Sequence, residues 1–289
     1  MFSSPIQLAV EHRMCYRFDR PINLRPHVIR LHPAPHCRTP VLAYALKVKP
    51  DGHVIDWLQD QFANYLARLV FAEPVTDFTV DVELSVEIDA IEPFDFLPAE
   101  SAQHYPFDYE PRLKSRLAPY LQTAEDRRLL SKWLGGMDFN RYATVDLLAA
   151  INQQVQDDVS YCVRMEPGVQ SCRQTLQLKS GSCRDSAWLL VQIFRHLGLA
   201  ARFVSGYLLQ PDTDHAAGIE DRVDLHAWTE VYVPGPGWVG LDSTSGFFTG
   251  AGHVPLACAP IPIAAAPMSG NIGKCGVMVE FYSSATRIN

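Results

Sequence analysis

The sequence predicts an α+β protein in which an antiparallel β domain precedes a domain of helices followed by antiparallel strands. In residues 78–90 ("FTVDVELSVEIDA") apolar and polar side chains alternate, which is typical of a strand with one buried face. Residues 123–197 contain runs with helical spacing, and residues 200–244 contain three strand-like segments. Helices first and strands afterwards indicate the α+β class for the second domain.

Four regions follow from this pattern. Residues 1–92 are predicted to form the N-terminal antiparallel β domain, a sandwich, in which Asp51-Gly52 between two β-like runs indicates a hairpin. Residues 93–122 contain five prolines without a sustained period and are predicted to be a linker. Residues 123–256 form the second domain, and residues 257–289, rich in Ala and Pro, are predicted to be an extended tail on the surface.

Composition excludes several classes of function. The 289 residues include 25 basic and 32 acidic side chains, a net charge of −7, which argues against nucleic acid as a partner. No window reaches the roughly 18 apolar residues of a membrane helix, and no signal-peptide pattern opens the chain, so no membrane partner and a cytoplasmic location are expected. Seven cysteines without a Cys-x-x-Cys pair favour free thiols over disulfides or structural zinc.

Cys183 stands at the predicted start of a helix. Ser182 is the expected N-cap and Asp185 completes a capping box, while Gly198 ends an apolar stripe formed by Ala187, Leu190, Val191, Phe194 and Leu197. A helix N-terminus carries roughly half a positive charge and free N–H groups, which favour a thiolate there. Position alone fits a buried, unreactive thiol equally well.

A nucleophilic cysteine needs a base, and the base needs a third group to hold its tautomer. His226 in "DLHAWTEVYV" and Asp242 in "GWVGLDST" lie on two predicted strands joined by Pro234-Gly235-Pro236-Gly237. Taken singly, a structural histidine and a turn-capping aspartate are the simpler interpretations. Taken together with Cys183, the three residues indicate a catalytic triad.

The motifs that carry these residues resemble the transglutaminase-like superfamily in its bacterial branch. They are Gly-Ser-Cys-Arg-Asp opening a helix, Leu-Gly-Leu-Ala-Ala-Arg leading into Ser-Gly-Tyr, His-Ala-Trp-Thr-Glu-Val-Tyr, and Gly-Trp-Val-Gly-Leu-Asp. The stretches "NLRPHVIRLHP" and "LVFAEP" resemble the β domain that precedes this core in bacterial members. The resemblance covers roughly residues 5–255.

This resemblance implies a papain-like α+β core with Cys183 as nucleophile, His226 as general base and acid, and Asp242 as orienter. The implied reaction is acyl transfer through a thioester, on a peptide or protein substrate, with no metal or organic cofactor. Tyr161 occupies about the place of an aromatic oxyanion donor in the superfamily, although a core-packing tyrosine fits equally well. Where the family commonly has Asp-Pro-Thr, this chain has Asp242-Ser243-Thr244.

Strand register tests the triad. If residues 234–237 form the whole loop, opposed residue numbers sum to 233 + 238 = 471, and Asp242 faces Thr229. His226 and Asp242 would then lie on opposite faces of the sheet. The triad therefore predicts a bulge or a longer, irregular loop that shifts the register.

Other candidates are assigned to packing. Trp228 and Trp238 are expected to form a packed wall. Because His196, His215 and His253 have no cysteine or acidic partner at ligand spacing, they are expected to be surface or packing histidines. Zinc bound by Cys183, His226 and Asp242 is disfavoured because one Cys and one His make a poor zinc set.

Three functional hypotheses remain. The first is a thiol hydrolase of peptide or isopeptide amides, and the second is a transferase that joins amines to acyl donors with the same triad. The third is a catalytically silent scaffold whose β domain binds a protein partner. Intact triad residues favour the two enzymes, of which hydrolysis is the principal expectation.

Overall fold

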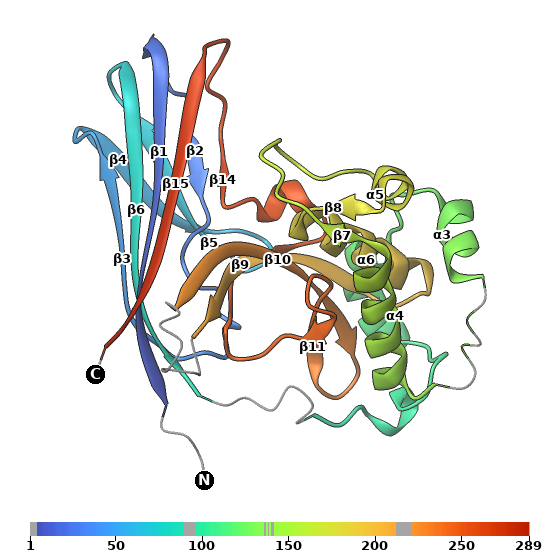
Figure 1. Ribbon diagram of the computed structural model, residues 1–289. Coiled ribbons are helices and arrows are strands. Elements are labelled where there is room, and N and C mark those ends of the chain that lie inside the picture. Colours follow the sequence, from blue (N-terminus) through green and yellow to red (C-terminus); the bar gives the residue numbers. More distant parts are fainter. Residues whose placement is uncertain are drawn as a thin grey trace.

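The computed structural model describes residues 5–89, 96–135, 137, 139, 142–211 and 221–288. A β sandwich and a core of helices around a sheet lie side by side (Figure 1). This is the predicted α+β arrangement with an N-terminal β domain. Within the described ranges, no helix has the length and apolar character needed to cross a membrane.

The sandwich consists of two four-stranded sheets that share one hydrophobic core. Their strand orders are β15-β1-β6-β3 and β14-β2-β5-β4. The strands from the N-terminal region are β1 (Ile6–Ile22), β2 (His27–Ile29), β3 (Val41–Lys49), β4 (His53–Gln59), β5 (Tyr65–Phe71) and β6 (Val75–Ile88). The alternating stretch that predicted a strand is β6, and its apolar side chains at 78, 80, 82, 84 and 86 are buried in that core.

The predicted hairpin at Asp51-Gly52 is wrong. The chain does reverse there, with Gly52 at φ +87°, but β3 pairs with β6 and β4 pairs with β5. The turn therefore carries the chain from one sheet to the other. The Asp51-Gly52 signal predicts that the chain reverses direction. It does not predict which strands β3 and β4 pair with, because packing of the two sheets determines that.

The C-terminal region differs from the predicted surface tail because it completes both sheets of the sandwich. Short β14 (Met268–Ser269) pairs with β2, and β15 (Val277–Arg287) pairs with β1 from Leu8↔Arg287 to Phe18↔Val277. A position near 256 is therefore no structural boundary. The side chains of 277–282 are largely exposed on both faces, so this strand lacks the alternation that marks β6 in the sequence.

Most of the predicted linker is packed structure. Residues 96–122 contain the 3-10 turn η1 (Glu100–Ala102) and the short helices α1 (Pro111–Arg116) and α2 (Ala118–Leu121), while residues 93–95 lie outside the described residues. Tyr109 binds the core at two points: its hydroxyl donates to Tyr232 O at 2.7 Å and accepts from Ala200 N at 3.0 Å. The segment is thus fastened to the sheet of the second domain.

The second domain is built around a buried helix. Its elements are α3 (Arg127–Leu134), α4 (Thr144–Asp158), β7 (Ser160–Tyr161), α5 (Cys172–Leu178), β8 (Ser180–Gly181), α6 (Cys183–His196), β9 (Ala201–Gln210), β10 (Arg222–Val233), β11 (Gly237–Asp242), β12 (Phe247–Phe248), β13 (His253–Ala259) and η3 (Pro262–Ala265). Helix α6 packs against β9 and β10 and against α3, α4 and α5. It is therefore buried almost all round instead of along one stripe.

The antiparallel sheet β12-β11-β10-β9-β13 connects the two domains. Ala227 and Val231 of β10 pack with α6, whereas Val223 of β10 and Tyr207 of β9 belong to the core of the sandwich. His226 lies on β10 between these two regions. The sheet thus places His226 where the helix and the β domain meet.

Candidate active site

The N-terminus of α6 holds Cys183 as the first helical residue, with 9% of its surface exposed. As the sequence predicts, Ser182 is the N-cap and Asp185 reaches back to it. Both the backbone N and the Oγ of Ser182 donate to Asp185 Oδ2 at 2.8 Å. Gly181 precedes them because a Cβ there would lie 2.8 Å from Asp185 Cβ. The turn before the cysteine is therefore fixed by Asp185.

Asp185 is itself anchored by the segment that follows β7. Arg164 Nε donates to Asp185 Oδ2 at 2.8 Å, and the backbone N of Gln170 donates to Oδ1 at 2.6 Å. Burial tends to raise the pKa of Asp185, but the bonds from Arg164, Gln170 and Ser182 outweigh it and lower that pKa. The start of α6 thus rests on a buried, charged carboxylate that is almost surrounded by donors.

The register of the β10–β11 hairpin agrees with the triad. Val233 pairs with Gly237, which leaves only residues 234–236 in the loop, and paired numbers sum to 233 + 237 = 470. Since Thr229 pairs with Leu241, the next step places Asp242 opposite Trp228, two residues from His226 and on the same face. The shift comes from a shorter loop, with Gly237 at φ +85°, so the predicted bulge or longer loop is wrong.

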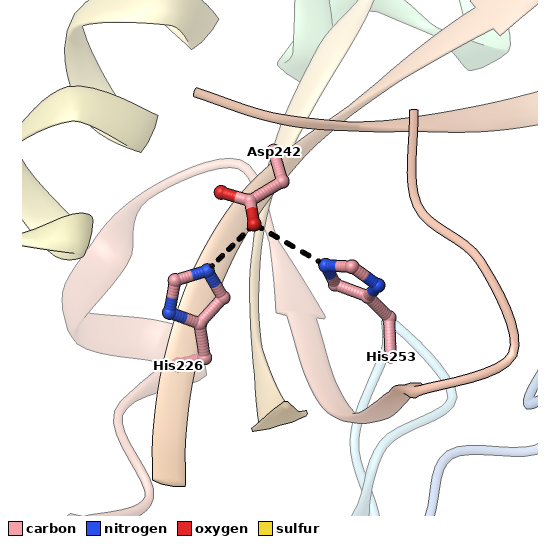
Figure 2. A group of neighbouring side chains, drawn as sticks. All are labelled: His226, Asp242 and His253. Carbon is pink, nitrogen blue, oxygen red and sulfur yellow. Dashed lines mark hydrogen bonds and ion pairs between the residues drawn. The ribbon is translucent and has the colours of Figure 1, made fainter. Parts of the chain in front are cut away.

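His226 and Asp242 form a close pair. His226 Nε2 lies 3.0 Å from Asp242 Oδ2 (Figure 2), and the other ring nitrogen, Nδ1, is left for the sulfur of Cys183. Burial lowers the pKa of His226, but contacts with Asp242 and with the Cys183 side chain raise it to about 10. The arrangement therefore favours the cationic form of His226 beside the Cys183 side chain.

Asp242 is held as a buried anion. It is 1% exposed, and burial tends to raise its pKa, but His226 and His253 lower the pKa of this carboxyl well below its usual range. Its Oδ1 accepts from the backbone N of Thr244 at 2.9 Å. The Asp-Ser-Thr sequence thus forms a turn that binds the carboxylate.

His253 is the residue that the sequence did not identify. Its Nε2 lies 3.3 Å from Asp242 Oδ2, the same oxygen that faces His226, so both rings converge on one carboxylate oxygen (Figure 2). His253 has no acidic partner at ligand spacing in the sequence and was expected to be a surface or packing histidine. It opens β13, which is separated from β11 by β10 and β9, so no local spacing could signal the contact.

The same three side chains are the only group of metal-ligand type found among the described residues. His226, Asp242 and His253 offer ligand atoms within 4.8 Å of one another. However, His253 Nδ1 accepts from the backbone N of Gly250 at 3.2 Å, so the neutral ring carries its proton on Nε2. Metal-ligating histidines have the opposite arrangement, in which the second nitrogen donates. The residues therefore fit a hydrogen-bonded relay better than a metal centre.

The other residues considered from the sequence have different environments. Tyr161 on β7 is 57% exposed, so it is no core-packing tyrosine; burial of part of its ring and the charge of Cys183 raise its pKa. Trp228 is buried, and Trp238 lies under the guanidinium of Arg202 at 4.2 Å. His196 contacts Ser131 Oγ at 2.9 Å. His215 lies outside the described residues.

Helix, sheet and side chains define a Cys–His–Asp arrangement on an α+β core. The model of the bacterial transglutaminase-like N-terminal region matches residues 8–87, and that of the transglutaminase-like superfamily matches residues 138–243. The chain thus belongs to the transglutaminase-like superfamily, a family of thiol-dependent enzymes, and carries the bacterial N-terminal region ahead of the core.

Relatives in mycobacteria and one solved structure are similar to this chain over most of its length. An uncharacterised protein of Mycobacterium tuberculosis is 24% identical over 247 residues, covering 82% of this chain and 78% of the relative. One from Mycobacterium leprae is 22% identical over 239 residues, covering 83% of each. A crystal structure from Cytophaga hutchinsonii, of a protein described provisionally as a cysteine protease, has a TM-score of 0.72 at 18% identity, covering 100% of this chain and 93% of that one. This last likeness concerns the fold alone.

Proposed function

We propose that the protein is a thiol-dependent acyl-transfer enzyme whose principal reaction is hydrolysis of a peptide or isopeptide amide. The observation that carries the proposal is the position of His226, between Asp242 on Nε2 and the Cys183 sulfur on its other side. A base held by a carboxylate next to a sulfur is what nucleophilic catalysis by cysteine requires. The family match supports the same class.

In the proposed first step, the Cys183 thiol passes its proton to His226, and the sulfur attacks the amide carbonyl carbon and forms a C–S bond. The carbonyl electron pair moves to oxygen, where the N-terminal N–H groups of α6 are suited to stabilise it. Tyr161, exposed beside the site, is a second proposed donor. When the tetrahedral species collapses, the C–N bond breaks and His226 gives its proton to the leaving nitrogen. A thioester on Cys183 results.

In the second step, His226 takes a proton from water, which attacks the thioester and releases a carboxylic acid and the thiol. A primary amine in place of water would give a new amide, which is the transferase alternative. Asp242 stays ionised throughout, because it orients His226 and stabilises its cationic form. The proposed substrate is a peptide or protein, and the proposed chemistry uses only side chains and water.

The test has two stages. First, the rate of Cys183 alkylation by iodoacetamide is measured against pH in the wild type and in His226→Ala, with mass spectrometry to identify the site. We expect the wild-type cysteine to react well below the ~8.5 midpoint of a free thiol and the variant to need higher pH. Identical profiles would contradict the catalytic interpretation and favour a silent scaffold.

Second, glutamine-containing and ordinary peptides are screened for release of ammonia or amine, with Cys183→Ala as the inactive control. Hydrolysis predicts product release that an added primary amine does not accelerate. Acceleration by the amine, with the amine found in the product by mass spectrometry, would favour the transferase. Release that persists in Cys183→Ala would exclude a thioester route.

A further inference from the structure

His253 reaches the proposed triad from a strand that is distant in the sheet. Its Nε2 lies 3.3 Å from Asp242 Oδ2, while His226 Nε2 lies 3.0 Å from the same oxygen (Figure 2). One carboxylate oxygen is thus flanked by two imidazole rings. The second oxygen, Oδ1, accepts from the backbone N of Thr244 at 2.9 Å. All the polar neighbours named here present donors to this buried carboxylate.

The tautomer of His253 follows from its other nitrogen. The backbone N–H of Gly250 donates to His253 Nδ1 at 3.2 Å, and a nitrogen that accepts cannot carry the proton. The neutral ring therefore has its proton on Nε2 and donates it to Asp242. The bond to Asp242 therefore needs only the single ring proton of the neutral tautomer.

Packing restricts the His253 ring. Trp228 contacts it edge-on, with ring centroids 5.2 Å apart and planes at 84°. Trp228 in turn lies so close to Gly206 on β9 that any Cβ at that position would clash with the indole. His253 and Trp228 both line a cavity of about 310 Å³. The ring is thus held in one orientation while leaving space beside it.

The charged and titratable groups near His253 are few. Asp242 and His226 face it directly, and Glu230, His36 and Arg38 line the same cavity. Glu230 is already paired with Arg202 and with His36. The bond to Asp242 is therefore the charge-assisted contact that His253 makes at the site.

We infer that His253 is a positioning residue of the proposed triad, which fixes the carboxylate of Asp242 so that its charge remains directed at His226. The inference rests on the proposed function. With His253 in place, rotation of the carboxylate about Cβ–Cγ away from His226 breaks two contacts of Oδ2, and without His253 it breaks only one. His253 opposes that rotation through its contact with Oδ2.

Two substitutions separate this role from a purely structural one. In His253→Gln the side-chain amide can place an N–H near the position of Nε2 and keep the bond to Asp242. In His253→Asn the shorter amide can place an acceptor near the position of Nδ1, which keeps the Gly250 bond but not the bond to Asp242. The readout is the pH profile of Cys183 alkylation by iodoacetamide, with circular dichroism as the folding control.

In His253→Asn we expect the midpoint of the Cys183 alkylation profile to rise by about one pH unit. At a pH below the midpoint, alkylation would then be about tenfold slower than in the wild type. The cause is that a misdirected Asp242 stabilises the imidazolium of His226 less, so the sulfur anion forms at higher pH. His253→Gln should restore most of the shift. Equal profiles for the Asn and Gln variants, or a larger shift for Gln, would overturn the inference.

A parallel His226→Ala arm distinguishes the two levels of failure. If His226→Ala matches the wild type, the proposed triad itself fails. If His226→Ala shifts the profile while His253→Asn does not, only the role of His253 fails. Nitrogen-15 NMR of histidine side chains in the wild type provides a second test that needs no variant to fold: a His253 ring protonated on Nδ1 alone would contradict the donor assignment.

Discussion

The ion pair that anchors the start of helix α6 predicts a measurable difference between two arginines. Arg164 Nε lies 2.8 Å from Asp185, with side chains 17% and 0% exposed, and Arg173 lies 2.6 Å from Asp126, with side chains 55% and 40% exposed. Distances are similar, but only the first pair is buried. Alanine at each position therefore compares a buried with an exposed ion pair in one protein.

Arg164→Ala leaves the charge of Asp185 buried with three donors, from Gln170 N and from the N and Oγ of Ser182. Losing one charged donor while the others remain should cost about 3 kcal/mol of unfolding free energy. Arg173→Ala should cost less than ~1 kcal/mol, because exposed pairs are screened by water. The measurement is urea unfolding followed by tryptophan fluorescence.

Unfolding measurements at several pH values provide a control for the loss of stability in Arg164→Ala. The pKa of Asp185 is depressed in the folded state, so the stabilisation is present above its unfolded pKa of about 3.9 and is lost as pH falls below that value. The gap between wild type and Arg164→Ala should accordingly be full at pH 7 and shrink in acid. Similar losses for both arginine variants at pH 7 would refute the reasoning.

Three further outcomes are expected. Burial lowers the pKa of His12 from 6.5 to about 4. Between pH 6.5 and 4 the unfolding free energy of the wild type should therefore fall by about 3 kcal/mol more than that of His12→Asn, as measured by urea unfolding. Equal decreases in the two proteins would contradict this prediction. Gly206→Ala should lower the melting temperature by several degrees, because its Cβ would clash with Val254 O and Trp228; an unchanged melting temperature would contradict it. Dialysis against EDTA should leave Cys183 alkylation unchanged, because His253 Nε2 carries a proton; a changed rate would show that a metal is involved.

The sequence predicts the elements that carry local signals. Alternation in β6, the capping residues of α6 and the motif around His226 each involve neighbouring residues, and the structure has each element where its pattern lies. Cys183, His226 and Asp242 are placed together by the fold. The catalytic role of the three residues stays a prediction until the alkylation experiment is done.

Features decided by distant contacts were missed or mistaken. His253 meets Asp242 only because β13 joins the sheet beside β9, a pairing that no local pattern encodes. The hairpin register depends on one residue of loop length, since Gly237 pairs with Val233 instead of extending the turn. Strands β3 and β4 adjoin in sequence but belong to different sheets.

Pairing of β15 with β1 has a consequence for how the protein is made. Along the chain β1 precedes the second domain, whereas one of its two neighbours, residues 277–287, follows that domain and is synthesised later. Until then β1 presents an unpaired edge to other nascent chains, which is a site for misassembly. The first sheet can close only after the second domain has been translated, so assembly of the sandwich depends on synthesis of the domain that lies between its strands in the sequence.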